Sequence, residues 1–92
     1  MASMKSVHII IHGEVQKVGF RAEARFVAKN LHLKGWVRNN TDGTVEITAE
    51  GEEDKLKEFY RWCQRGPRNA RVDKLGLEWK EATKKFKQFI IV

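Results

Sequence analysis

The sequence has little of what would place it outside the cell or in a membrane. Cys63 is the only cysteine, so no internal disulfide can form and a reducing, cytoplasmic setting is expected. The longest apolar run near the N-terminus, Ile9 to Ile11, is too short for a signal peptide or a membrane span. Low-complexity runs and internal repeats are missing as well, which argues against disorder. We therefore expect a folded cytoplasmic protein with no membrane segment.

The length of the chain limits its organisation. At 92 residues it has room for one small domain, residues 1–92, and not for a second core. Its hydrophobic content of 41% is enough for a packed interior. Nothing in the sequence requires an obligate dimer, so we expect a monomer.

The net charge of +6 is compatible with two kinds of anionic partner, nucleic acids and small anionic substrates. The positive residues are scattered, however, with a single short cluster at residues 84–87 and no contiguous basic arm. Charge alone therefore favours an ordinary solvated surface and identifies no partner.

Apolar residues recur with two periods, which predicts five strands and two helices. Alternation predicts strands over residues 6–12, 36–39, 44–50, 72–79 and 86–92. Helical spacing predicts a first helix over 21–30 and a second from 52–54 to a stop at Gly66-Pro67. The expected buried stripes are Phe20, Ala24, Val27 and Leu31 in the first helix and Leu56, Phe59, Tyr60 and Cys63 in the second.

The order of these elements is β-α-β-β-α-β followed by a short C-terminal strand. Residues 40–43 predict a hairpin turn, because Asp-Gly supplies the positive φ angles that such turns need. Two helices with single apolar stripes need one sheet face to cover. We therefore predict an α+β, ferredoxin-like split β-α-β sandwich, with an antiparallel sheet and both helices on one face.

This architecture hosts several function classes, and the residues argue against some of them. A metal carrier needs a pair such as Cys-x-x-Cys in the first loop, whereas Cys63 lies on a core stripe. An RNA-binding module needs aromatic residues on its central strands. The outward side of the third strand is expected to be Thr44, Glu46, Thr48 and Glu50, which has no aromatic residue and would repel phosphate. We expect no nucleic-acid partner.

The histidines predict neither a metal site nor a catalytic triad. His8, His12 and His32 lack ligand spacing with one another or with any carboxylate or cysteine cluster. We expect all three to be exposed structural residues. No Ser-His-Asp or Cys-His set can be assembled with any specificity.

The most informative segment is Gly13 to Arg21, which joins the first strand to the first helix. Glycines bracket the loop, and such a loop can turn several backbone N–H groups toward one point. The helix N-terminus adds a partial positive charge and Arg21 a full one. A cation is mildly unfavourable at a helix start, so Arg21 is easier to explain with an anion between it and the amides. The segment predicts a site for a small anion, above all phosphate.

The motifs of the chain resemble those of the acylphosphatase family. Residues 13–21, G-E-V-Q-K-V-G-F-R, are similar to the family signature G-x-V-Q-G-V-G-F-R. The segments G-W-V-R-N at 35–39, D-G-T-V at 42–45, G-P-x-x-A-R-V at 66–72 and the closing F-I-I-V also resemble family segments. The resemblance spans nearly the whole chain in the right order. Residue Lys17 departs from it, because the family usually has glycine there.

The resemblance implies hydrolysis of acyl phosphates to a carboxylate and inorganic phosphate, with no metal and no cofactor. Arg21 matches the phosphate-binding arginine, and Asn39 matches the water-orienting asparagine. The backbone loop Glu14–Phe20 matches the family's phosphate cradle, with the binding positions Val15, Gln16, Lys17, Val18, Gly19 and Phe20. The implied partners are a small acyl phosphate as substrate and inorganic phosphate as product or inhibitor.

These residue types suit that chemistry. A guanidinium can contact two phosphate oxygens at once, and preformed amides add stabilisation without reorganising. A neutral amide can orient water beside a dianion, where a carboxylate would be repelled.

Three alternatives stay open: Asn40 in place of Asn39, a non-catalytic phosphate-binding module of the same fold, and a domain of a larger carbamoyl-phosphate-handling protein. The ends of the chain lead us to expect a free-standing enzyme. If residue 17 has a positive φ, its lysine is strained.

Overall fold

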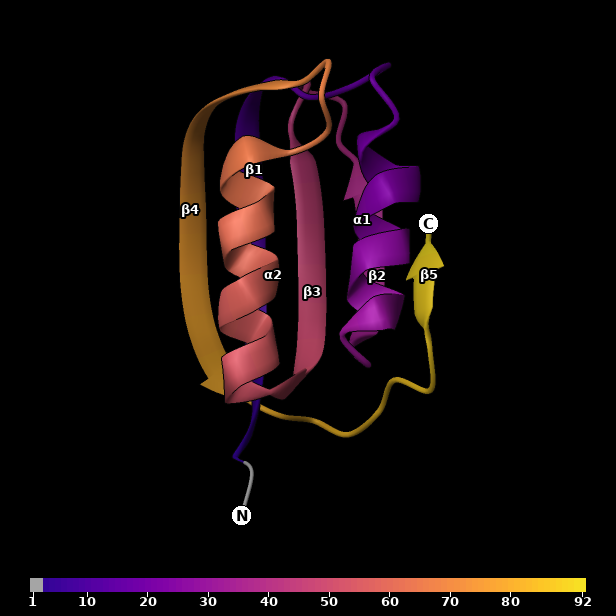
Figure 1. Cartoon of the computed structure of the whole chain (residues 1–92), viewed down its shortest axis with the longest axis vertical. Helices are drawn as coiled ribbons and strands as arrows, with labels where there is room; N and C mark the ends of the chain where they lie inside the picture. Colours follow the sequence, from indigo (N-terminus) through magenta and orange to yellow (C-terminus); the bar gives the residue numbers. More distant parts are fainter. Residues whose placement is uncertain (1–2) are drawn as a thin grey trace.

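Alternating apolar residues of the central strands face the core. The computed structural model describes residues 3–92 (Figure 1). The elements follow the order β1 (Met4–Glu14), α1 (Phe20–Asn30), β2 (Lys34–Asn39), β3 (Val45–Glu52), α2 (Glu53–Arg65), β4 (Arg71–Glu81) and β5 (Phe89–Ile91). Every predicted element is present, and the first two residues of the expected domain lie outside the described part. Several strands are longer than predicted because pairing continues into polar residues, as in Lys34↔Glu50 and Glu14↔Arg71.

The five strands form one sheet in the order β4-β1-β3-β2-β5. The pairs β1–β3, β1–β4 and β2–β3 are antiparallel, whereas β2 and β5 are parallel. The predicted ferredoxin-like α+β fold is confirmed, but a fully antiparallel sheet is wrong for β5. After β4 the chain crosses to the opposite edge of the sheet, and β5 then runs in the same direction as β2 (Figure 1).

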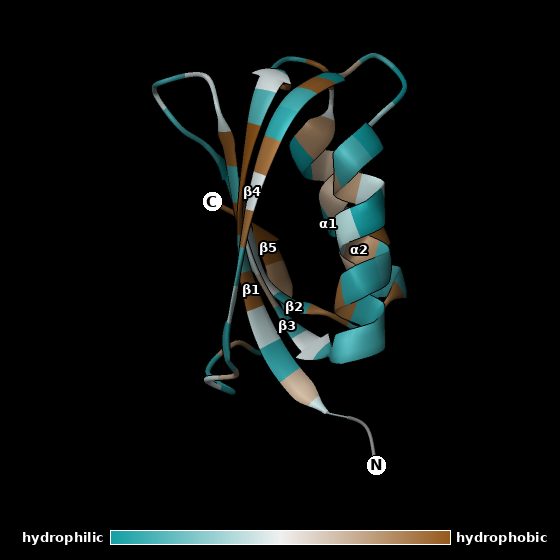
Figure 2. Cartoon of the chain, turned by 90° about the vertical axis from the view of Figure 1, so that its left-hand side faces the viewer, coloured by the Kyte–Doolittle hydropathy of each residue, from teal (hydrophilic) through white to brown (hydrophobic). Residues whose placement is uncertain are grey.

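Both helices cover the same face of the sheet, so the domain has two layers (Figure 2). The core lies between these layers, where Val7, Ile9 and Ile11 of β1 are 0% exposed. Helix α1 has 11 residues and α2 has 13, and within residues 3–92 neither is long and apolar enough to cross a membrane.

The helical stripes differ in detail from the predicted ones. In α1, Ala28 is buried, whereas Val27 and Leu31 are only partly buried. In α2, Trp62 was not part of the predicted stripe, yet its ring lies 5.3 Å edge-on from Phe20. This contact joins the start of α1 to α2.

The hairpin turn between β2 and β3 uses its residues differently from the prediction. Only Gly43 has a positive φ, of 92°, and Gly43 N donates to Asn40 O at 3.2 Å. Asp42 acts through its side chain instead, because its Oδ1 accepts hydrogen bonds from the N–H and hydroxyl of Thr44. These bonds hold the pKa of the exposed Asp42 below its usual value.

The outer face of the sheet is not the open acidic surface that the sequence predicted. Thr44 and Glu50 are buried, at 4% and 5% exposed. Glu46 accepts hydrogen bonds from Arg38 at 2.9 Å and from His8 at 2.6 Å. The His8 bond, aided by Arg38, holds the pKa of Glu46 below its usual value despite burial. The prediction of an exposed, unengaged histidine is therefore wrong for His8. Because Glu46 and Glu50 are both engaged, repulsion of a phosphate backbone by free carboxylates no longer supports the exclusion of nucleic acid.

The buried carboxylate of Glu50 anchors the connection from β4 to β5. It accepts hydrogen bonds from the N–H and hydroxyl of Thr83, both at 2.8 Å, and from Lys84 N at 2.9 Å. Burial by itself would raise the pKa of Glu50, but the bonds from Thr83 and Lys84 outweigh it and the pKa is lowered.

A carboxyl whose pKa is lower in the folded than in the unfolded protein stabilises the fold above its unfolded pKa. That contribution is lost as the pH falls through the folded pKa. We therefore expect Glu50→Gln to lower the free energy of unfolding at pH 7 by about 1.5–3 kcal/mol, the range for hydrogen bonds to charged groups. The difference from the parent protein should shrink as the pH falls below about 4.5, the usual pKa of a glutamate.

Urea denaturation at pH 7 and pH 3.5 measures this difference. The matched control is Glu58→Gln on the exposed surface of α2, which should change stability by less than about 0.5 kcal/mol. Equal losses for Glu50→Gln at both pH values would contradict the anchoring role of the charge.

Candidate active site

The site lies where β1 and β2 end, at the same end of the sheet. Strand β3 runs between them and is antiparallel to both, so β1 and β2 point the same way. Val45 of β3 pairs with Ile11 of β1 on one side and with Asn39 of β2 on the other. The loop after β1 therefore emerges beside the last residue of β2.

The loop from residue 15 to residue 19 leads directly into the N-terminus of α1. It contains two residues with positive φ, Lys17 at 64° and Gly19 at 78°, and Gly19 is the N-cap of the helix. Among the side chains of residues 3–92, none caps this helix. Residue 17 thus has the positive φ at which a lysine is expected to be strained, a backbone conformation that favours glycine.

The backbone N–H groups of this segment are left available. Among the described residues, those of residues 16–22 donate no hydrogen bond within the protein, and the first helical bond here runs from Glu23 N to Gly19 O at 3.1 Å. The first N–H groups of a helix have no intrahelical partner and carry its partial positive charge. An uncapped N-terminus next to such a loop suits an anion.

A cavity of about 230 Å³ opens at this place. Its lining residues are Val15, Lys17, Gly19, Phe20, Arg21, Ala22, Asn39 and Ile91. The two residues predicted to be catalytic, Arg21 and Asn39, thus line one cavity together with part of the predicted loop. Gln16 and Val18 do not line it, and Val18 packs against the core. Contacts of the loop amides with phosphate stay a prediction.

Asn39 has an unusual environment for a polar side chain. It ends β2 and is partly exposed, but its Oδ1 is buried and has no hydrogen-bond partner within residues 3–92. The side chain of the alternative residue, Asn40, is already engaged: its Nδ2 donates to Thr44 Oγ1 and its Oδ1 accepts from Arg38. The cavity lining therefore favours Asn39 over Asn40.

The electrostatics of the cavity are positive. In the described chain, neither Arg21 nor Lys17 forms an ion pair, and no carboxylate lines the cavity. Glu14, just before the loop, is paired with Arg71 at 3.0 Å. Two cations are thus left without a counter-charge beside the available amides.

The side chain of Gln16 has a role that sequence analysis missed. Its Nε2 donates to Asn40 O at 2.8 Å and to Thr44 O at 2.9 Å. These bonds tie the loop after β1 to the turn that follows Asn39. The sequence indicates only the backbone of Gln16 as a binding group, because the acceptors of its side chain lie 24 and 28 residues away along the chain.

Gly13 does not serve the loop in the way that the sequence suggested. It lies at the register shift between β1 and β4 with a φ of 132°, and a Cβ there would clash with the backbone oxygen of Arg71. Glycine is needed here for the close approach of β4. Gly13 does not line the cavity, so the bracket of two glycines reflects two unrelated constraints.

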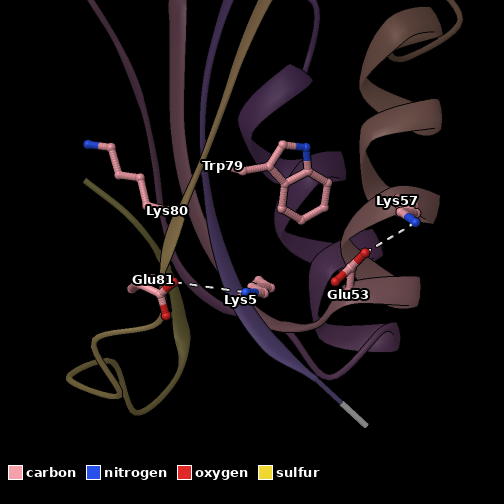
Figure 3. Close-up of a pocket in the computed structure, with 6 residues that line it drawn as sticks. All are labelled: Lys5, Glu53, Lys57, Trp79, Lys80 and Glu81. Atoms are coloured by element: carbon pink, nitrogen blue, oxygen red, sulfur yellow. Dashed lines mark ion pairs between the residues drawn. The ribbon is translucent and has the colours of Figure 1, made fainter.

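A larger cavity, of about 490 Å³, lies at the opposite end of β1 (Figure 3). It is lined by Lys5, Glu53, Lys57, Trp79, Lys80 and Glu81. Two of its lysines are paired with carboxylates, Lys57 with Glu53 at 3.3 Å and Lys5 with Glu81 at 3.9 Å (Figure 3). Its charges largely cancel, so it is a poorer site for phosphate than the smaller cavity.

The remaining reactive groups do not form a second centre. Cys63 is buried in the core, and burial raises the pKa of its thiol far above the usual value, so it stays a neutral packing residue. No group of three or more histidine, cysteine or acidic residues in the described region could hold a metal ion.

The comparison with protein families agrees with this geometry. The acylphosphatase family model matches residues 7–91, nearly the whole chain. The chain belongs to the acylphosphatase family. Acylphosphatases are hydrolases, and membership implies an acyl phosphate substrate and phosphate as a product.

Relatives and solved structures support the assignment. An acylphosphatase of Legionella pneumophila strain Paris is 54% identical over 74 residues, covering 77% of this chain and 81% of the relative. The crystal structure of acylphosphatase from Bacillus subtilis superposes with a TM-score of 0.92 at 34% identity, covering 98% of this chain and 99% of the other. Full-length HypF, in its phosphate- and nucleotide-bound form, matches at 33% identity and a TM-score of 0.90. That match covers all of this chain but 12% of HypF.

The Gln16 tether generates a prediction about phosphate affinity. Gln16→Met keeps the length of the side chain but removes both donors, so the loop should be held less firmly against the turn after Asn39. We expect stability to fall by about 1 kcal/mol, or about 4–8 °C in Tm. Inorganic phosphate, measured by calorimetry, should bind about three- to tenfold more weakly, because the loop must then be ordered on binding.

The matched control is Gln64→Met on the exposed side of α2, which should leave phosphate affinity unchanged. A Gln16→Met protein that loses stability but binds phosphate normally would show that the tether supports the fold alone.

Proposed function

We propose that this chain hydrolyses acyl phosphates with Arg21 and the loop amides holding the phosphoryl group and Asn39 positioning the attacking water. The observation that carries the proposal is that Asn39, a polar residue whose Oδ1 has no partner within residues 3–92, lines the same cavity as Arg21. Water cleaves the bond between phosphorus and the bridging oxygen, and the products are a carboxylate and inorganic phosphate.

Arg21 and the amides of residues 15–20 bind the substrate in this mechanism. The guanidinium donates to two phosphoryl oxygens at once, a geometry that a lysine lacks. The N–H groups that donate no bond within the protein, together with the N-terminus of α1, stabilise the charge that develops on the same oxygens. Because these donors are held by the fold, they need little reorganisation in the transition state.

Asn39 aligns the nucleophile. An amide group can both donate a hydrogen bond to a water and accept one from it, so Asn39 at the cavity wall can orient the water. A neutral amide does this without repelling the phosphoryl dianion. Since no carboxylate or histidine lines the described cavity, the proton of the water passes to a phosphoryl oxygen of the substrate itself.

The proposal needs neither a metal ion nor a cofactor. The carboxylate leaving group of an acyl phosphate is already a good one, so the task is to position the phosphoryl group and neutralise its charge. Arg21 and the helix N-terminus supply positive charge for that purpose. Hydrolysis of acetyl phosphate should therefore persist in excess EDTA.

We also propose that the chain works as a cytoplasmic monomer with residues 1–92 as one domain. The buried, protonated Cys63 fits a reducing compartment. Sedimentation equilibrium should give a mass of 10.7 kDa, and a mass twice as large would contradict the monomer.

Two variants separate the roles of binding and of water positioning. Arg21→Lys should lower kcat/KM for acetyl phosphate by about 10³-fold, within the range for a transition-state arginine, and should weaken phosphate binding. Asn39→Ala should lower kcat by about 10²–10³-fold, as for a lost oxyanion-hole donor, and spare phosphate binding.

The controls are Arg61→Lys on α2 and Asn40→Ala in the turn, each of which should retain kcat within about tenfold. Normal turnover by the Asn39→Ala protein would remove Asn39 from the mechanism. Phosphate binding without any hydrolysis by the unaltered protein would instead indicate a non-catalytic phosphate-binding module.

A further inference from the structure

Lys17 is the residue of the site whose presence the backbone does not explain. Its φ of 64° lies in the left-handed region, which glycine adopts freely and a lysine does not. The residue is exposed, so its side chain gains nothing from burial in the core. Strained residues of this kind cluster at ligand sites, where the side chain has a function that offsets the strain.

The charge of Lys17 is directed to no acidic group of the protein. Within residues 3–92 it takes part in no ion pair, although it lines the cavity together with Arg21. The acidic residue closest to it in sequence, Glu14, is engaged by Arg71. The ammonium group is therefore free to meet an anionic ligand that occupies the cavity.

The size of the cavity limits which part of a substrate reaches Lys17. A volume of about 230 Å³ is below the roughly 300–1,000 Å³ of sites that enclose a drug-sized ligand. It has room for a phosphoryl group and a short part of the acyl chain, so the rest of the acyl chain extends to the rim. Lys17 is an exposed cation at that rim.

Arg21 and Lys17 suit different parts of one substrate. The planar fork of Arg21, with the loop amides, matches the phosphoryl oxygens. The ammonium of Lys17 is a compact charge on a flexible four-carbon stem, which can reach beyond a phosphate held by the backbone of its own loop.

We propose that Lys17 is a specificity-determining residue that favours acyl phosphates whose acyl group carries a second anionic group, such as a carboxylate. The proposal rests on the proposed function, because it assumes that the phosphoryl group occupies the Arg21 end of the site. It names the class of substrate for that site: an acyl phosphate of a dicarboxylic acid in preference to that of a neutral carboxylic acid.

The test compares adipoyl phosphate with hexanoyl phosphate, which have similar acyl chains with and without a terminal carboxylate. The measured quantity is the ratio of their kcat/KM values, in which any common effect on the phosphate loop cancels. In Lys17→Gln and Lys17→Gly the ratio should fall by about three- to tenfold, as expected for a lost, partly solvated ion pair. Lys17→Arg keeps the charge and should keep the ratio.

Salt provides a second measurement on the unaltered protein. Raising the NaCl concentration from 0.02 to about 0.5 M shortens the Debye length and should lower the ratio toward that of Lys17→Gln, whose own ratio should stay nearly constant. This change cannot come from the backbone strain at residue 17, which is the same at both salt concentrations.

Each other outcome is decisive. An unchanged ratio in all three variants overturns the proposal. If kcat/KM also falls equally for both substrates, Lys17 is assigned to the phosphoryl group instead. A ratio that changes only in Lys17→Gly would indicate loop conformation instead of charge and would also overturn it. If the unaltered protein hydrolyses neither substrate, the proposed function itself fails, which is a different result.

Discussion

The arrangement of the site depends on one constraint, the position of β3 between β1 and β2. Because β3 is antiparallel to both neighbours, the chain leaves β1 and β2 at the same end of the sheet. Val45 shows this directly, since it pairs with Ile11 on one side and with Asn39 on the other. Helix α1 follows β1 after a short loop, so its N-terminus lies at that end too. The hydrogen bonds of the sheet thus bring the water-positioning candidate to the anion site.

Charge is distributed unevenly over the domain, and this unevenness distinguishes the site. Two carboxylates on the outer face of the sheet are satisfied: Glu46 by Arg38 and His8, and Glu50 by backbone and hydroxyl donors. At the described cavity, two cations and an uncapped helix N-terminus have no such partner. Such features cost stability when nothing is bound, through repulsion between like charges and unsatisfied polar groups. They become favourable once a phosphoryl group is present, which is why the same features indicate function.

Local sequence patterns predicted the elements well, because a strand or a helix with one buried face leaves its period in the chain. The alternation in β1 and the helical stripe of α2 are examples, and both lie where they were expected. The parallel pairing of β5 was not predictable in this way, since a strand of three residues carries almost no pattern and its direction depends on the path that precedes it. The burial of Glu50 was missed for a related reason: its donors, Thr83 and Lys84, lie more than 30 residues away.

The sequence by itself determined the family, the fold class and the identities of Arg21 and Asn39 as site candidates, because these depend on residue types at short, fixed spacings. Only the tertiary structure decided that the two residues line one cavity, that Asn39 rather than Asn40 belongs to it, and that Gln16 ties the loop to the turn. It also separated Gly13, which the approach of β4 requires, from the loop itself. The physical reason is that these relations are set by strand register and by packing between distant segments. The sequence shows its local periodicity, but it does not show which hydrogen-bond partner each polar group has in the fold.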